Sequence, residues 1–437
     1  MRRVYISFLG TNDYVECIYE SGIGDAKNPV RFVQETTLSL FSENANADDR
    51  GFIFITDEAR KKNWEDDGQR DREKKCNKQC QGLKNRIDLL NLPFPVEAIP
   101  IPEGHSEEEI WDIFQLVFGI LKEDDEVVFD ITHAFRSIPM LAIVILNYAR
   151  VLKNIRLLGI YYGAFEALGP SWEVAKMPVE ERRAPLLNLS SLNRLMEWTF
   201  AVDRFLEAGD AKEVSRLARE AAAPILKNSR GKDTGASATR GIANALEFFS
   251  KNLNTCRGPI VVKAAEYLKS ELNKAMNVED VKPLVPLFEH IRKRVSQFRG
   301  DTVHDGVQAA KWCLDHNLIQ QGYTILQETL ITHFVNNNEQ DSGVIDNRNI
   351  AAAAVWFAKD DTPEDKWYGD AGKDRALTIK YIRMFKTMEG LSDLYRQMKP
   401  YRDDLLHAGY RNDPKKPDDF KIKLADLIPK VEAMIES

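Results

Sequence analysis

The sequence has no long apolar run. Residues 140–146 form the longest such run after the N-terminus, and they are too few to cross a bilayer. The first residues imitate a signal peptide only briefly, because the apolar stretch 4–9 that follows Met1-Arg2-Arg3 breaks at Thr11. We therefore expect a cytoplasmic protein with no membrane association.

Cysteines are few and scattered. Cys76 and Cys80 lie in a charged run that we interpret as helical, and no second Cys/His pair is near them in the sequence. We treat them as ordinary thiols and predict no metal site. The first apolar run is not followed by a G-x-G-x-x-G motif, which argues against a dinucleotide cofactor. The complete set is Cys17, Cys76, Cys80, Cys256 and Cys313.

Positively charged residues do not outnumber negatively charged ones either. Lys and Arg number 60 against 67 Asp and Glu, so the net charge of −7 argues against a broad basic surface for duplex DNA. A local basic groove stays compatible with this balance. The 437 residues are enough for two or three domains, and the hydrophobic content of 43% is ordinary for a globular protein.

The first part of the chain alternates strand and helix patterns. Short apolar runs separated by helical spacing predict βαβ units and a parallel, Rossmann-like sheet. We assign this α/β domain to residues 1–190. Its predicted strands are 4–9, 51–55, 96–101, 127–131 and 156–162, with a further short strand at 185–189.

We predict that the remaining residues, 191–437, form an all-α domain. Apolar residues recur there at a spacing near 3.6, which is typical of helices that bury one face. Two polar segments, 336–348 and 359–374, are expected to be loops, the first of them mobile. The predicted helical segments are 192–208, 213–225, 246–253, 262–274 and 309–335.

The most informative stretch is Asp130-Ile131-Thr132-His133-Ala134-Phe135-Arg136-Ser137, directly after an apolar strand. In an open α/β sheet, ligands bind beyond the carboxyl ends of the strands, where loop N–H groups and helix N-termini attract anions. Gly10-Thr11-Asn12-Asp13 and, more weakly, Thr56-Asp57 follow other strands in the same way. The plain alternative is structural: Thr132 caps a helix and the Gly10–Asp13 segment is an ordinary turn.

A second constellation lies near the C-terminus, in Pro400-Tyr401-Arg402-Asp403-Asp404-Leu405-Leu406-His407-Ala408-Gly409. Proline should break the preceding helix and Gly409 should cap a short helical unit over 400–408. Arg402 and His407 would point about 140° apart on a regular helix. Either the helix is distorted, or a second chain completes the site across a two-fold axis.

Arginine and histidine together suit metal-free RNA cleavage. The 2′-OH attacks the adjacent phosphorus, histidine transfers protons near neutral pH, and arginine stabilises the phosphorane-like anion. The alternative is a solvated helix end. Arg299 and His304 have the same spacing, but Gly300 follows that arginine and the pair sits between helices, so we interpret it as a coincidence.

The first motif is similar to the D-x-T-H-G-F-R-S signature of CARF proteins, which sense cyclic oligoadenylate, with Ala134 in place of glycine. The second is similar to the R-x4–6-H motif of HEPN ribonucleases. Together the chain resembles the CARF–HEPN effector ribonucleases of type III CRISPR–Cas systems.

That resemblance implies a homodimer or higher homo-oligomer that cleaves single-stranded RNA when a cyclic oligoadenylate binds, with no cofactor. It implies catalysis by Arg402 and His407, assisted by Asp403. Rival interpretations are a non-catalytic sensor, a sensor domain that degrades its own ligand through Thr11 and Thr132, and a toxin-like ribonuclease on a dimerisation scaffold. The implied ligand contacts are Gly10, Thr11, Asn12, Asp13, Thr56, Asp130, Thr132, His133, Arg136 and Ser137.

Overall fold

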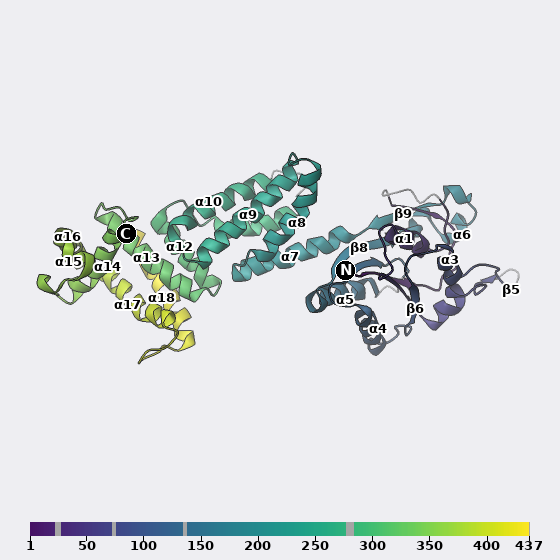
Figure 1. Ribbon diagram of the computed structural model, residues 1–437, viewed down its shortest axis with the longest axis horizontal. Coiled ribbons are helices and arrows are strands. Elements are labelled where there is room, and N and C mark those ends of the chain that lie inside the picture. The colour runs from purple at the N-terminus through teal and green to yellow at the C-terminus, as the bar shows by residue number, and fades with distance from the viewer. Residues whose placement is uncertain (22–27, 72–75, 134–137, 277–283, 437) are drawn as a thin grey trace. The chain divides into compact units, whose positions relative to one another are not determined.

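The computed structural model describes residues 1–21, 28–71, 76–133, 138–276 and 284–436. Arg136, Ser137 and Ala134 therefore lie outside the described residues. The chain divides into two compact units, Met1–Arg194 and Leu195–Ser437 (Figure 1). The sequence placed this division after residue 190. An α/β unit followed by a helical unit is the layout that the sequence predicted.

The N-terminal unit is built on a seven-stranded sheet of order β2-β9-β8-β7-β1-β3-β6. Strands β8, β7, β1, β3 and β6 are parallel to one another. The chain starts at β1, continues outward through β3 to β6, and then returns to form β7 on the other side of β1. The direction of winding therefore reverses between β1 and β7. The central strands are β1 (Arg3–Leu9), β3 (Arg50–Ile55), β6 (Val96–Pro100), β7 (Glu126–Asp130) and β8 (Arg156–Gly163).

Three further features extend this sheet unit. Strand β9 (Arg183–Asn188) runs antiparallel to β8. On its other edge β9 pairs with the short strand β2 (Ile18–Glu20), and these two strands are parallel. A small hairpin pairs β4 (Arg70–Asp71) with β5 (Cys76–Asn77). The helical interpretation of the run around Cys76 is therefore wrong, because Cys76 lies in the two-residue strand β5, which is too short to show a period in the sequence.

Alternation along β1 builds a core on each face of the sheet. Val4, Ile6 and Phe8 face α4 (Glu107–Ile120) and α5 (Ile138–Lys153). Tyr5 and Leu9 face the layer that holds α1 (Val33–Ser42) and α3 (Leu83–Leu89). Helices thus cover both faces of the sheet (Figure 1).

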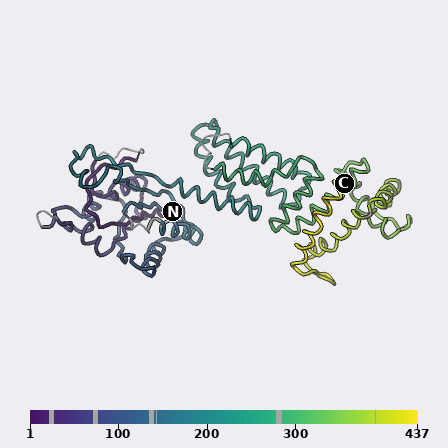
Figure 2. The backbone as a smooth tube through the Cα atoms, turned by 180° about the vertical axis from the view of Figure 1, so that it is seen from behind, coloured from purple at the N-terminus to yellow at the C-terminus, as the bar shows by residue number. Residues whose placement is uncertain are grey.

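The helical unit contains two adjoining cores. Helix α12 contributes Ala309 and Trp312 to the first core and Val307 and Ala310 to the second. Figure 2 shows the early helices of this unit, in teal, lying side by side. The helices are α7 (Ser190–Ala208), α8 (Lys212–Asn228), α9 (Thr234–Asn254), α10 (Gly258–Met276), α11 (Val285–Val295), α12 (Thr302–Asp315), α13 (Ile319–Asn337), α14 (Ile345–Lys359), α15 (Gly369–Lys373), α16 (Arg375–Thr387), α17 (Glu389–Leu406) and α18 (Pro417–Glu436).

Three expectations for this unit need correction. The segment 359–374, expected to be a loop, contains a short 3-10 helix (Glu364–Lys366) and helix α15. The segment 309–335 is two helices, because Asn317 adopts a left-handed φ of 58° that ends α12. Proline does not break the helix near residue 400 either: α17 continues through Pro400 to Leu406. Burial of Leu391, Tyr395 and Met398 along α17 outweighs the hydrogen bond that proline removes.

Candidate functional site

The two polar loops named from the sequence meet at the point where the sheet reverses. Ser7 of β1 pairs with Asp130 of β7, so the loops that follow these strands leave the same edge side by side. A Cβ on Gly10 would collide with the Tyr14 hydroxyl and lie 3.4 Å from the His133 carbonyl oxygen. Glycine at this position therefore leaves room for the Tyr14 hydroxyl, and the His133 carbonyl of the other loop lies within contact distance of it.

Asp130 is fully buried beneath this edge and anchors it. Its Oδ1 accepts hydrogen bonds from the Thr132 backbone N–H (3.0 Å) and the Thr132 hydroxyl (2.6 Å). Its Oδ2 accepts from the hydroxyls of Tyr5 (3.1 Å), Ser7 (3.3 Å) and Thr37 (3.2 Å). Burial raises the pKa of the Asp130 carboxyl, while these hydrogen bonds act in the opposite direction. Asp130 thus joins β7, β1 and α1 from within.

Thr132 extends this network to the next strand. While its hydroxyl donates to Asp130, the same oxygen accepts a hydrogen bond from the Gly163 N–H at the end of β8 (2.8 Å). The contacts of Asp130 and Thr132 are therefore those of positioning residues. Their direct contact with a ligand stays a prediction.

His133 is the next residue and sits against the first loop. Its ring packs on Tyr14 with centroids 4.2 Å apart. Burial lowers the pKa of His133 to about 3, so the ring is neutral at physiological pH. Its Nε2 is buried and has no hydrogen-bond partner among the described residues. A neutral imidazole with a free nitrogen suits a hydrogen bond to a base or a hydroxyl better than an ion pair with phosphate.

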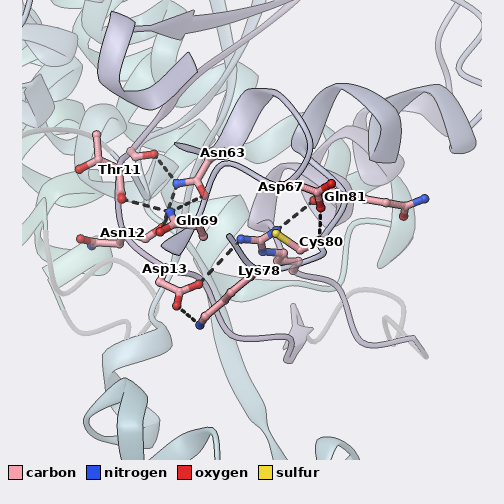
Figure 3. Close-up of polar contacts among 11 residues, drawn as sticks. Thr11, Asn12, Asp13, Asn63, Asp67, Gln69, Lys78, Cys80 and Gln81 are labelled. Atoms are coloured by element: carbon pink, nitrogen blue, oxygen red, sulfur yellow. Dashed lines mark hydrogen bonds and ion pairs between the residues drawn. The ribbon is translucent and has the colours of Figure 1, made fainter. Parts of the chain in front are cut away.

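The Gly10–Asp13 loop is held by two buried amide side chains that the sequence reasoning missed (Figure 3). Asn63 Nδ2 donates to the carbonyls of Gly10 and Asn12, both at 2.8 Å. Gln69 Nε2 lies 3.3 Å from the Thr11 carbonyl and 2.9 Å from Asn63 Oδ1. Because C=O and N–H point in opposite directions across a trans peptide, the following N–H groups are directed away from these amides. No sequence signal marked Asn63 or Gln69.

Both positively and negatively charged side chains lie near the Gly10–Asp13 loop. Asp13 forms ion pairs with Lys78 and, at 3.9 Å, with Arg31 (Figure 3 shows the Lys78 contact). The Arg31 side chain is only 7% exposed and its Nη1 donates to the Gln81 carbonyl at 3.0 Å. Two cations therefore stand beside loop N–H groups, with one carboxylate balancing them.

Thr56, at the end of β3, has a capping role. Its hydroxyl accepts a hydrogen bond from the Ala59 N–H (3.2 Å) at the start of the short helix α2 (Asp57–Ala59). The side chain is 2% exposed. These contacts agree with the structural alternative for a threonine that follows a strand.

The C-terminal pair lies at the end of α17. Arg402 and Asp403 belong to the helix and His407 is its C-cap. The His407 N–H bonds the Asp403 carbonyl at 3.0 Å, so the helix stays regular up to this point. The two side chains therefore diverge, as five residues of α-helix require. This removes helix distortion as a way to bring them together within one chain.

The end of α17 has the hydrogen bonds of a Schellman motif. The Gly409 N–H bonds the Asp404 carbonyl at 3.0 Å, and the Ala408 N–H bonds the Leu405 carbonyl at 3.3 Å. The left-handed residue next to the cap is Ala408 (φ 51°), followed by Gly409 (φ 76°). His407 is exposed at this turn, while Arg402 is partly buried. Asp403 pairs with Arg411 at 3.8 Å.

The second R-x4-H pair has a structural explanation. Asp305 is buried and accepts hydrogen bonds from the N–H groups of Arg299 (2.6 Å) and Gly300 (2.9 Å). His304 Nδ1 lies 3.2 Å from the same carboxylate. These contacts fix the turn that leads into α12.

The fold defines a class: a doubly wound α/β unit, with the two polar loops described above at its switch point, joined to an all-α unit. No protein-family model matches the chain. It is similar to the CRISPR-associated protein MJ1674 of Methanocaldococcus jannaschii, with 25% identity over 329 residues. The match covers 73% of this chain and 43% of that protein, so the chain spans less than half of its relative. The similarity supports an association with CRISPR.

None of the helices in the described residues combines the length and apolar character needed to span a bilayer. Within the same residues, His, Cys, Asp and Glu side chains do not gather in groups of three or more that could hold a metal ion.

Proposed function

We propose that the protein is a CRISPR-associated ribonuclease: its α/β unit binds a cyclic oligoadenylate, and its helical unit then cleaves single-stranded RNA without a metal ion. The observation that carries this proposal is the meeting of the Gly10–Asp13 and Asp130–His133 loops at the switch point of the sheet. Similarity to a CRISPR-associated protein supports the biological setting.

The proposed ligand suits the chemistry of this edge. Loop N–H groups, Arg31 and Lys78 offer hydrogen bonds and positive charge to phosphates. The neutral ring of His133 offers a hydrogen bond to an adenine edge or a ribose hydroxyl. Phosphate would compete with Asp13 for its two cations, so ligand binding and rearrangement of these ion pairs would be one event.

An exposed apolar face on α5 supports the proposed dimer. Five residues at helical spacing are exposed on it, and Met140 and Val151 are 74% and 77% exposed. Tyr148 joins this face to α4 through Phe114 (ring centroids 5.5 Å) and Phe118 (5.1 Å). A contiguous apolar face of this kind is typical of an interaction surface. The five residues are Met140, Ile143, Val144, Tyr148 and Val151.

A two-fold dimer also supplies what one chain lacks at the second site. Because Arg402 and His407 diverge on one regular helix, we propose that the arginine of one chain acts with the histidine of its partner. Exposed His407 would transfer protons while the 2′-OH attacks phosphorus, and arginine would stabilise the anionic transition state. The ring-shaped ligand would favour the dimer arrangement that closes this cleft.

The test is cleavage of a fluorescent single-stranded RNA by the full chain in a chelator, with and without cyclic tetra- or hexa-adenylate. We expect cleavage with one ring only, and its loss in His407→Ala with ring binding retained. His105→Ala changes an exposed histidine of the other unit and serves as the control. Ring binding without cleavage would instead support a non-catalytic sensor, and undiminished cleavage by His407→Ala would refute the site.

A further inference from the structure

A hollow between α11 and α12 in the helical unit is outside both sites described above. It has a volume of about 460 Å³, within the range of roughly 300–1,000 Å³ that small-molecule sites occupy. The lining residues of α11 are three and four positions apart and those of α12 three, four and seven, so one face of each helix lines the hollow. The lining residues are Leu206, His290, Lys293, Arg294, Gln297, Phe298, Gln308, Lys311, Trp312 and Asp315.

Positive charge prevails in this lining although the chain as a whole is acidic. Lys293, Arg294 and Lys311 face one lining carboxylate, Asp315, which pairs with Arg294 at 3.3 Å. Lys311 is paired with Glu432 at 2.5 Å. Lys293 has no ion-pair partner among the described residues. The hollow therefore retains a cation that is available to an anion.

The floor of the hollow is apolar and rigid. Phe298 and Trp312 are 2% and 5% exposed, and Trp312 packs against Phe205 and Phe249 (ring centroids 5.7 and 5.1 Å). Gln297 and Gln308 add side-chain amides at the wall. The Trp312 ring is stacked on His316 (ring centroids 4.2 Å), so the floor offers apolar ring edges and not an open ring face. These apolar edges, the amide groups and the cationic rim suit the base, base edge and phosphate of a nucleotide.

We infer that the α11–α12 groove, defined by these lining residues, binds a nucleotide, either within a single-stranded RNA or as a free nucleoside triphosphate. If the nucleotide belongs to an RNA strand, the inference rests on the proposed function and extends it. The groove would then bind the substrate at a second point, apart from Arg402 and His407. A free nucleotide would make it an effector site independent of RNA cleavage.

The experiment measures binding with full-length His407→Ala, so that cleavage cannot remove the probe. Anisotropy of a labelled single-stranded RNA and calorimetry with ATP distinguish the two sources. In the same background we compare Lys293→Glu with Lys227→Glu, which reverses the charge of an exposed lysine on α8 outside the groove. Matching thermal unfolding curves would show that both variants are folded.

We expect Lys293→Glu to weaken one probe at least about tenfold, with Lys227→Glu unchanged. For RNA, loss of one phosphate contact should also lower the slope of log affinity against log salt by about 0.7. The inference fails if neither probe binds, or if Lys293→Glu binds both as tightly as Lys227→Glu. If RNA binding depends on Lys293 but the parent chain cleaves no RNA, the proposed function is wrong. The inference about the groove would still hold.

Discussion

The hydroxyl of Tyr5 donates to the carboxylate of Asp130 across 3.1 Å in the interior of the α/β unit. Neither residue is exposed, and each lies on one of the two strands that flank the switch point of the sheet. The network that includes this hydrogen bond therefore supports the proposed ligand loops from below. The same burial makes it a stability element that can be tested without any ligand.

Asp130→Ala should lower the free energy of unfolding by about 3 kcal/mol or more, because the hydroxyls of Tyr5, Ser7 and Thr37 lose a shared acceptor. Ser7→Ala removes one of these donors and also one acceptor of the Gln34 amide (3.2 Å), and it should cost about 1 kcal/mol. Chemical denaturation followed by far-UV circular dichroism measures both. Equal stability of Asp130→Ala and the parent would refute the anchoring role.

His133 should make the protein less stable in mild acid. Its pKa is about 3 in the folded chain and 6.5 when exposed, so the unfolded chain binds more protons between these values. Stability therefore falls as pH drops below 6.5, by up to about 1.4 kcal/mol per pH unit. Unfolding at pH 7 and pH 5 should show a smaller decline for His133→Phe than for the parent. Identical declines would contradict a buried neutral ring.

Asn63→Ala should loosen the Gly10–Asp13 loop, because two loop carbonyls lose their donor. We expect faster backbone hydrogen exchange in that loop and at least about tenfold weaker binding of the cyclic ligand. Asn85→Ala alters an exposed asparagine of the same unit and is the matched control. Unchanged exchange would show that Asn63 does not hold the loop, whatever the ligand proves to be.

Val151→Glu should disrupt the proposed dimer, because it places a charge at an apolar position of α5 that is 77% exposed. Sedimentation of the parent and the variant measures the change in mass, and ring-dependent RNA cleavage should disappear with the dimer. Leu89→Glu, at an exposed apolar residue of α3, controls for surface charge as such. A parent chain that sediments as a monomer, or a variant that remains dimeric, argues against this face.

A mixture of Arg402→Ala and His407→Ala chains tests whether the cleft is shared. Each variant alone should be inactive, since every dimer lacks one of the two groups. Random exchange makes about half of the dimers mixed, and these combine one intact arginine with one intact histidine from opposite chains. Recovery of ring-dependent cleavage on mixing is the expected result. No recovery, with exchange verified by differently labelled chains, would contradict a composite site.

The sequence alone determined much of the fold of this protein. Apolar runs placed the five parallel strands, most clearly β1, β3 and β7, because a strand buried on both faces must be continuously apolar. The polar residues that end these runs located Gly10–Asp13 and Asp130–His133. Patterns that depend on fewer residues failed, as at the hairpin of β4 and β5 and at β2.

Tertiary structure decided what each residue of these motifs contacts. The strand order brings the first loop beside the fourth central strand, a contact between positions more than a hundred residues apart. Asn63 and Gln69 reach the first loop from more than fifty residues away in the sequence, so no local pattern could reveal them. Packing along α17 likewise overrode Pro400 and kept Arg402 and His407 apart. Local composition encodes where strands and helices form, whereas long-range packing fixes which side chains meet.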